Sequence, residues 1–288
     1  MSATSSVGQS RNSEIFKHVF VLLVLMAAFY PLYMMVNIST KTNKEFYQNP
    51  WYPQGLLESP SQQAEVIGEN YRTGFLTVYS SIPNTIFLAV TTTACILTVA
   101  VLAAYVFARF NFPLKKLFWS LLLILMLMPG VANLIPLFVL LRNIGLLNTY
   151  TALILTGTAG AQVFNLYILR NYIEDTPETL FEAAEVDGAG HLRQIWEIVV
   201  PMNGSILATL ACLAFIATWN NFLLPLLIIR DPDRLPIAVQ LYRLEGAYVR
   251  IWGPTMAAYA VAAVPLVILF IFTMRFFIRG VGAGALKG

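Results

Sequence analysis

The sequence contains few charged residues for its length. Asp, Glu, Lys and Arg make up 11% of its 288 residues, against about 25% in soluble domains, whereas 58% of the residues are hydrophobic. The net charge of +3 is spread along the chain without a basic stripe, which argues against a nucleic-acid partner. Most of the chain is therefore expected to be surrounded by lipid rather than water.

The usual signatures of catalysis and nucleotide binding are also missing. The chain has no Gly-x-x-x-x-Gly-Lys-Ser/Thr loop, so it lacks the common means of binding ATP phosphates. It has no HExxH, CxxC or GxSxG motif, and His18 and His191 are far apart in sequence. Cys95 and Cys212 each lie in a long uncharged segment, where a thiol behaves as a small apolar group. We therefore expect no catalytic, cofactor or metal site in this chain.

Six apolar segments are long enough to cross a membrane as helices: residues 19–36, 84–108, 117–141, 149–169, 204–229 and 251–274. A crossing needs about 20 mostly apolar residues, because each residue rises about 1.5 Å through a hydrocarbon layer about 30 Å thick. Helices are expected because backbone polar groups in lipid must be paired within the segment. The first segment lacks a small-residue cleavage site and is expected to remain as an anchor. The sequence therefore predicts an all-α polytopic membrane protein with six transmembrane helices.

Proline and glycine interrupt several of these segments. Pro129, Gly130 and Pro136 lie in the third, Pro225 in the fifth and Pro265 in the sixth. Proline removes a helical hydrogen bond, so it persists in lipid only where neighbouring helices or cavity water satisfy the freed carbonyl. Ordinary kinks between packed helices and a lined transport pathway both fit this pattern.

Six crossings place both termini on one side of the membrane, and we expect that side to be the cytoplasm. The charge bias is weak: the short loop containing Arg109, Lys115 and Lys116 favours this orientation, whereas Arg142 opposes it. The predicted organisation is a cytoplasmic tail (1–18), a first transmembrane helix (19–36), an external loop (37–83), a five-helix core (84–279) and a cytoplasmic tail (280–288). Within the external loop a short interfacial helix is expected at 73–82, and Pro83 suits the first turn of the next helix.

The connection at residues 171–203 is unusually rich in charge for this chain. Thr176 is suited to capping a helix, Pro177 to its first position, and Gly188 to ending it in the left-handed conformation. Three glutamates of the resulting short helix share one face, because residues three and four apart are neighbours: Glu178, Glu182 and Glu185. A simple solvated acidic connector would have a similar composition.

The spacing in this connection resembles the EAA loop of ABC importer permeases. The match consists of Glu182-Ala183-Ala184, Gly188, Ile198 and Val200-Pro201, where the family usually has Leu-Pro. Ile195 stands where the family usually has an aromatic residue. In that family the loop forms a coupling helix that sits in a cleft of the ATPase subunit. The resemblance implies that the ATPase-coupling residues are Glu182, Ala183, Ala184, Asp187, Gly188 and Pro201.

Further matches cover the chain from about residue 73 to its end and resemble the carbohydrate-uptake, maltose-type MalG-like branch of the family. They are Ala103-Ala104-Tyr105, Ala108-Arg109-Phe110, Ile135-Pro136-Leu137, Leu146-Leu147-Asn148-Thr149, Trp219-Asn220, Leu235-Pro236, Trp252-Gly253-Pro254-Thr255 and Gly284-Ala285-Leu286-Lys287-Gly288. Val281-Gly282 replaces the usual Leu-Thr, and the first 70 residues match only in topology.

The resemblance implies a type I ABC importer permease fold in the cell inner membrane. It also implies an ABC ATPase dimer that binds ATP and Mg²⁺, a second and non-identical permease subunit, an extracytoplasmic solute-binding protein and a carbohydrate cargo. The connection at 230–250, which combines charges with Tyr242 and Tyr248, suits a docking rim for the binding protein, although a solvated loop would look similar.

Uncharged hydrogen-bonding residues within the predicted spans are candidates for contact with the cargo. Amides can bond to sugar hydroxyls, and an indole can pack against a sugar ring. The candidates are Asn133, Gln162, Asn165, Trp219, Asn220 and Asn221. Hydrogen bonds between helices would use the same types of side chain.

The sequence therefore predicts a permease subunit for a sugar, oligosaccharide or related polyol. The same family could instead carry glycerol phosphodiesters or uronate oligosaccharides. A passive channel is the alternative from another class, but it has no use for a coupling helix. An intramembrane enzyme or a proton-driven transporter would need paired ionisable groups within the spans, and the sequence has none.

Overall fold

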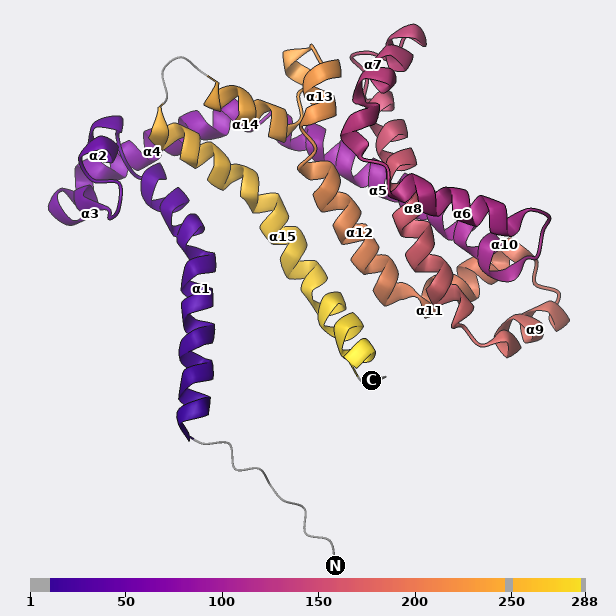
Figure 1. Ribbon diagram of the computed structural model, residues 1–288. Helices are drawn as coiled ribbons and strands as arrows, with labels where there is room; N and C mark the ends of the chain where they lie inside the picture. Colours follow the sequence, from indigo (N-terminus) through magenta and orange to yellow (C-terminus); the bar gives the residue numbers. More distant parts are fainter. Residues whose placement is uncertain (1–10, 247–250, 286–288) are drawn as a thin grey trace, which may run out of the picture. The chain divides into compact units, whose positions relative to one another are not determined.

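The protein is described here by a computed structural model that covers residues 11–246 and 251–285. Every regular element within these ranges is helical, which confirms the predicted all-α class (Figure 1). The chain divides into two compact units. Unit 1 contains Met1–Thr77 and Ala247–Val261, and unit 2 contains Val78–Gly246 and Ala262–Gly288.

The described residues contain five helical spans long and apolar enough to cross a membrane: Glu14–Ser39, Ser81–Arg109, Tyr150–Glu174, Gly204–Ile228 and Trp252–Met274. The predicted third span instead consists of two segments, Lys115–Met126 and Gly130–Asn143, which meet at 95°. A sixth crossing exists if this bent pair is one span. Five of the six predicted spans are therefore confirmed, and the predicted third span is a broken helix.

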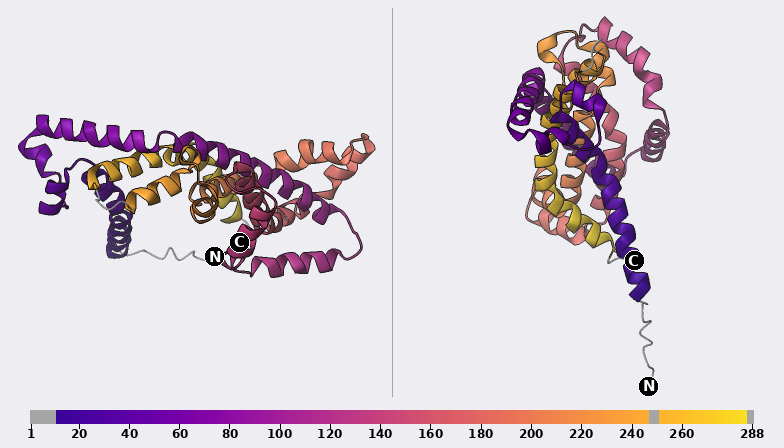
Figure 2. Two further views of the ribbon diagram at one scale, coloured as in Figure 1. Left: turned by 90° about the horizontal axis from the view of Figure 1, so that it is seen from above. Right: turned by 90° about the vertical axis from the view of Figure 1, so that its left-hand side faces the viewer.

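Unit 1 contains α1 (Arg11–Ser39), α2 (Asn43–Gln48), α3 (Gln54–Glu58), α4 (Pro60–Val78) and the first part of α15 (Trp252–Ala285). In α1 the helix runs continuously through Pro31 (Figure 2). Its most apolar stretch is 0% buried. The apolar side chains of α1 are thus available to lipid on all sides. The helix begins at Arg11, inside the segment predicted as a tail.

Lys41 organises the short helices of unit 1. Its side chain is 3% exposed, and its ammonium donates hydrogen bonds to the carbonyls of Asn49 (2.5 Å) and Tyr52 (2.8 Å). Burial lowers the pKa of Lys41 from its usual value, and nearby Glu45 opposes this shift. Asn70 on α4 donates to the carbonyls of Ser39 and Lys41, both at 2.9 Å. These bonds satisfy backbone groups that the irregular chain would otherwise leave buried and unpaired.

One helix boundary differs from the prediction. The expected interfacial helix at 73–82 does not exist as a unit, because α4 ends at Val78 and α5 (Ser81–Arg109) begins after a turn at Tyr79 and Ser80. Pro83 accounts for the restart, since proline lacks an N–H and is tolerated in the first turn of a helix but not in its interior. The prediction that Pro83 lies in a first turn is confirmed.

Unit 2 is built on three packed helices, α5, α8 (Tyr150–Glu174) and α12 (Gly204–Trp219), with shorter elements at both ends. The shorter elements are α6 (Lys115–Met126), η1 (Gly130–Asn133), α7 (Leu134–Asn143), α9 (Glu178–Val186), α10 (His191–Gln194), η2 (Ile195–Val199), α11 (Val200–Met202), α13 (Leu223–Ile228), η3 (Pro232–Arg234) and α14 (Ile237–Glu245). Gly157 allows α8 to approach α5 closely, because a β-carbon there would lie 3.0 Å from the Thr92 methyl group. The second part of α15 also belongs to this unit and continues to Ala285, into the predicted tail.

The prolines of unit 2 mostly lie where helices begin rather than where they bend. Pro136 and Pro225 are each the third residue of a short helix, α7 and α13. The interruption of the predicted fifth span therefore falls at residues 220–222, before Pro225. Pro265 lies inside α15, which continues through it.

Candidate functional site

The acidic helix predicted in the connection at 171–203 is present as α9. Pro177 precedes it with ψ 129°, an extended backbone that makes Glu178 the first helical residue. Thr176 does not cap α9, contrary to the prediction, because its hydroxyl donates to the Tyr172 carbonyl at the end of α8 (3.3 Å). Thr176 therefore still belongs to the end of α8, and the chain turns at Pro177.

Gly188 ends α9 as predicted. Its φ is +75°, the left-handed region that glycine adopts without strain. The Gly188 N–H donates to the Glu185 carbonyl (3.0 Å), and the Ala189 N–H donates to the Ala184 carbonyl (2.8 Å). These two bonds form a Schellman cap, which satisfies the last carbonyls of the helix. A β-carbon at Gly188 would meet no atom within 4 Å, so backbone conformation rather than space requires glycine here.

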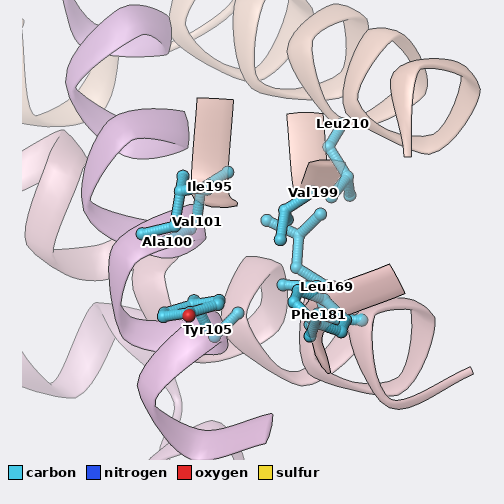
Figure 3. Close-up of a cluster of buried hydrophobic side chains, with 10 residues drawn as sticks. Ala100, Val101, Tyr105, Leu169, Phe181, Ile195, Val199 and Leu210 are labelled. Atoms are coloured by element: carbon cyan, nitrogen blue, oxygen red, sulfur yellow. The ribbon is translucent and has the colours of Figure 1, made fainter. Parts of the chain in front are cut away.

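Phe181 is the buried side chain through which α9 attaches to the rest of unit 2. It is 0% exposed and packs in a cluster with Tyr105 of α5, Leu169 and Ile173 of α8, and Val199 of η2 (Figure 3). The remaining α9 side chains are exposed or half-buried, and the helix stands apart from the three packed helices (Figure 1). The acidic face that carries Glu182 and Glu185 is therefore open to a partner.

The last turn of α5 contacts both Phe181 and the start of α9. The Arg109 guanidinium lies 4.1 Å from the centroid of the Phe181 ring, and its Nη1 lies 3.4 Å from Oε1 of Glu178. The Glu178 side chain is 72% exposed, so this ion pair is weak, while the stacking on Phe181 is shielded. In the sequence, Arg109 served as an orientation signal and as part of the family match Ala108-Arg109-Phe110, and neither predicted this contact with α9.

Tyr105, one turn earlier on α5, contacts the segment that follows α9. Its hydroxyl lies 2.6 Å from Oε1 of Gln194 and 3.1 Å from Nδ1 of His191. The π-helical segment η2 and the short α11 follow α10, and Pro201 lies exposed in α11. Gln194 was not singled out from the sequence, and the one signal for Tyr105 was the match of Ala103-Ala104-Tyr105 to the family.

The six candidate cargo residues are dispersed along unit 2. Gln162 donates to the Ile96 carbonyl of α5 (3.3 Å), whereas Asn165 and Asn220 each donate to the carbonyl four residues earlier in their own helix. Trp219 is buried and stacks on Phe215, and Asn133 is exposed in η1. Only the bond of Gln162 joins two helices, which is the alternative that the sequence left open.

A small, mostly apolar hollow lies between α5, α8 and the break after α12. Asn221 lines it, and the other five candidates do not; the polar residues beside it are Thr85, Thr92 and Thr218. Oγ1 of Thr92 is buried without a hydrogen-bond partner among the described residues. Within those residues no group of three or more His, Cys, Asp or Glu side chains is arranged to hold a metal ion.

Comparison with known proteins identifies the family. Residues 96–283 match the family described as binding-protein-dependent transport system inner membrane component. The chain is 33% identical over 279 residues to a probable ABC transporter permease protein, YurM, of Bacillus subtilis, covering 94% of this chain and 87% of that protein. It is 29% identical over 281 residues to the sn-glycerol-3-phosphate transport system permease protein UgpE of Yersinia pestis, covering 94% and 96%.

Solved structures show the same fold. A chain in the crystal structure of a bacterial ABC transporter involved in the import of the acidic polysaccharide alginate matches with a TM-score of 0.78 and 22% identity, covering 93% of this chain and 99% of that one. A second, from the bacterial alginate ABC transporter in complex with an alginate pentasaccharide-bound periplasmic protein, matches with a TM-score of 0.60 and 16% identity, covering 91% and 93%. The chain belongs to the family of binding-protein-dependent transport system inner membrane components and is a multi-pass ABC transporter permease subunit.

Proposed function

We propose that this permease subunit imports a carbohydrate or related polyol and is driven by a separate ABC ATPase dimer that docks on α9. The observation that carries this proposal is the construction of α9: an exposed acidic helix, ended by a left-handed glycine and attached through one buried side chain, Phe181. Such a helix presents Glu182, Ala183, Ala184 and Asp187 to a partner. Small alanines let the partner approach closely, and the carboxylates can pair with its basic residues.

The carbohydrate cargo is supported by the fold shared with an alginate importer and by the sequence matches to the maltose-type branch. The 29% identity to UgpE, whose name specifies sn-glycerol-3-phosphate, favours a phosphorylated glycerol compound as the second candidate. Both cargoes carry hydroxyls suited to the amides of Gln162, Asn165 and Asn221. Asn133, Trp219 and Asn220 complete the proposed pathway.

The rest of the proposal concerns topology and partners. Both termini and the connection at 171–203 would lie in the cytoplasm, with ATP and Mg²⁺ bound by the ATPase. A solute-binding protein would deliver the cargo from the opposite side. A second permease is expected, because a two-site ATPase dimer offers two docking clefts and this chain supplies one α9. The resemblance to the MalG-like half, which usually pairs with a dissimilar permease, supports a non-identical partner.

The docking role of α9 is tested by Glu182→Lys and Gly188→Val. Truncating one partner of a buried charge pair costs about 2 to 5 kcal/mol, and charge reversal adds repulsion. Valine at positive φ costs about 1 to 3 kcal/mol and should disturb the end of α9. We expect both variants to reach the membrane normally, but to lose ATPase copurification or cargo uptake.

Glu197→Lys is the matched control. Glu197 lies in the same connection, but its carboxylate pairs at the surface with Arg193 (2.9 Å), away from α9. It should retain the ATPase. Normal ATPase retention and uptake in both α9 variants, at normal membrane abundance, would refute the docking role. Cargo binding by the cognate solute-binding protein, screened against sugars and glycerol phosphates, separates the two cargo candidates.

A further inference from the structure

A chain of hydrogen bonds joins α5 to the last turn of α9. The Tyr105 hydroxyl donates to Oε1 of Gln194 (2.6 Å), and Nε2 of Gln194 donates to the Ala189 carbonyl (3.2 Å). The Ala189 N–H in turn donates to the Ala184 carbonyl inside α9 (2.8 Å). Tyr105 is 2% exposed and Gln194 is 1% exposed, so water does not compete for this connection.

A second contact from α5 holds the beginning of α9. Arg109 lies one helical turn after Tyr105, on the same face of α5, and stacks on Phe181 while approaching Glu178. The final turns of α5 therefore contact the beginning of α9 directly, through Arg109, and are connected to its end through Gln194. This arrangement is not required by chain connectivity, because α9 is joined through short loops to α8 and α10.

The contacts of α9 with α8 are of a different kind. Phe181 packs against Leu169 and Ile173, but among the described residues no α9 side chain forms a hydrogen bond with α8. Apolar packing is not directional, so it holds the position of α9 without fixing its angle. Hydrogen bonds are directional, and those that reach α9 from the membrane-spanning helices come from α5.

We propose that α5 is the helix that moves together with α9, and that Tyr105 and Gln194 are positioning residues that fix the angle of α9 for this purpose. The inference rests on the proposed docking of an ATPase at α9. With the tyrosine hydroxyl removed, α9 remains attached through Phe181 but pivots about it. ATP hydrolysis then proceeds without a matching movement of α5, so the ATP consumed per cargo molecule rises.

The experiment uses the complete transporter with its ATPase, second permease and solute-binding protein, reconstituted in lipid vesicles. The variants are Tyr105→Phe, Gln194→Leu and the double variant, and the readouts are ATPase copurification and ATP hydrolysed per cargo imported. We expect normal copurification and about a fivefold rise in ATP per cargo for each single variant, the effect of losing about one hydrogen bond. The double variant should equal the singles, because both changes break the same connection.

Tyr172→Phe is the control, since it removes an exposed hydroxyl near the end of α8 and should leave the ratio unchanged. An unchanged ratio in both single variants overturns the proposal. Loss of ATPase copurification in Tyr105→Phe also overturns it, because the hydroxyl would then build the docking surface. Failure of the docking role itself is distinguishable, because Glu182→Lys and Gly188→Val would then retain both the ATPase and cargo uptake.

Discussion

Asn148 joins two loops of unit 2 through its side chain. Its Oδ1 accepts hydrogen bonds from the N–H groups of Arg230 (2.9 Å) and Asp231 (3.1 Å), while its own φ is +60°. Asn148→Ala removes the oxygen that accepts both hydrogen bonds and places alanine, which tolerates the left-handed region less well than asparagine, at this φ, so we expect a loss of about 2 to 4 kcal/mol in stability. Asn148→Gly removes the same oxygen but adopts this φ without strain, so its loss should be smaller. Thermal unfolding in detergent measures both, and equal losses would contradict the part assigned to backbone strain.

Residues whose role depends on local geometry could be predicted, and residues whose role depends on distant partners could not. Gly188 was predicted because a left-handed helix end has a recognisable residue type. Tyr105 and Gln194 meet only after α5 and α10 pack together, and a single sequence shows no trace of that pairing. Thr176 was misplaced because the capping preference of threonine does not reveal which of two adjacent helices it will join.

At the scale of elements, hydropathy located the spans because lipid requires long apolar helices. It did not locate their interruptions. The third span is bent by 95° beside Pro129 and Gly130, whereas the fifth is interrupted at 220–222 rather than at Pro225. Proline is best tolerated near the start of a helix. Packing decides whether the helix before it stops, bends or, as at Pro265, continues.

Gly253 in α15 is a close contact between elements of unit 1. A β-carbon there would lie 2.2 Å from the Lys41 carbonyl oxygen and 2.4 Å from Nδ2 of Asn70. Gly253→Ala must therefore displace backbone or break the Asn70 bonds, and we expect a loss above about 2 kcal/mol in stability. Gly68→Ala in α4 is the control, because its β-carbon meets nothing within 4 Å and alanine favours helix. The unfolding temperature should fall for the first variant and stay equal or rise for the second.

At the scale of the whole molecule, the prediction that the connection at 230–250 forms a docking rim for the solute-binding protein can be tested on its described residues. Tyr242 and Arg243 of α14 are exposed, whereas Tyr248 and Arg250 lie outside the described residues. We expect Arg243→Glu to weaken stimulation of ATP hydrolysis by the binding protein, with a larger effect at low salt because ions screen exposed charges. Arg193→Glu, in the connection that carries α9, should leave the salt dependence of this stimulation unchanged. Unaltered stimulation by the binding protein in Arg243→Glu would argue against this surface.

The family and the all-α membrane architecture could be predicted, since composition and motif spacing persist without any tertiary information, although the motif matches begin only near residue 73. The division into two units could not, because it depends on how residues after 246 return to the first 77. Trp252, for example, donates its backbone N–H to Asn43 (2.8 Å) and stacks on Phe46. The match of Trp252-Gly253 to the family did not reveal that Trp252 contacts Asn43 and Phe46.

The π-helical segment Ile195–Val199 holds about one residue more per turn than an α-helix would. That surplus residue sets the rotational phase between α10 and α11. If the same five residues wound as an ordinary α-helix, α10 would be rotated by about 100° relative to α11. Gln194 would then face away from Tyr105, although neither residue had been changed. The π-helical winding of this segment thus keeps α10 in phase with α5.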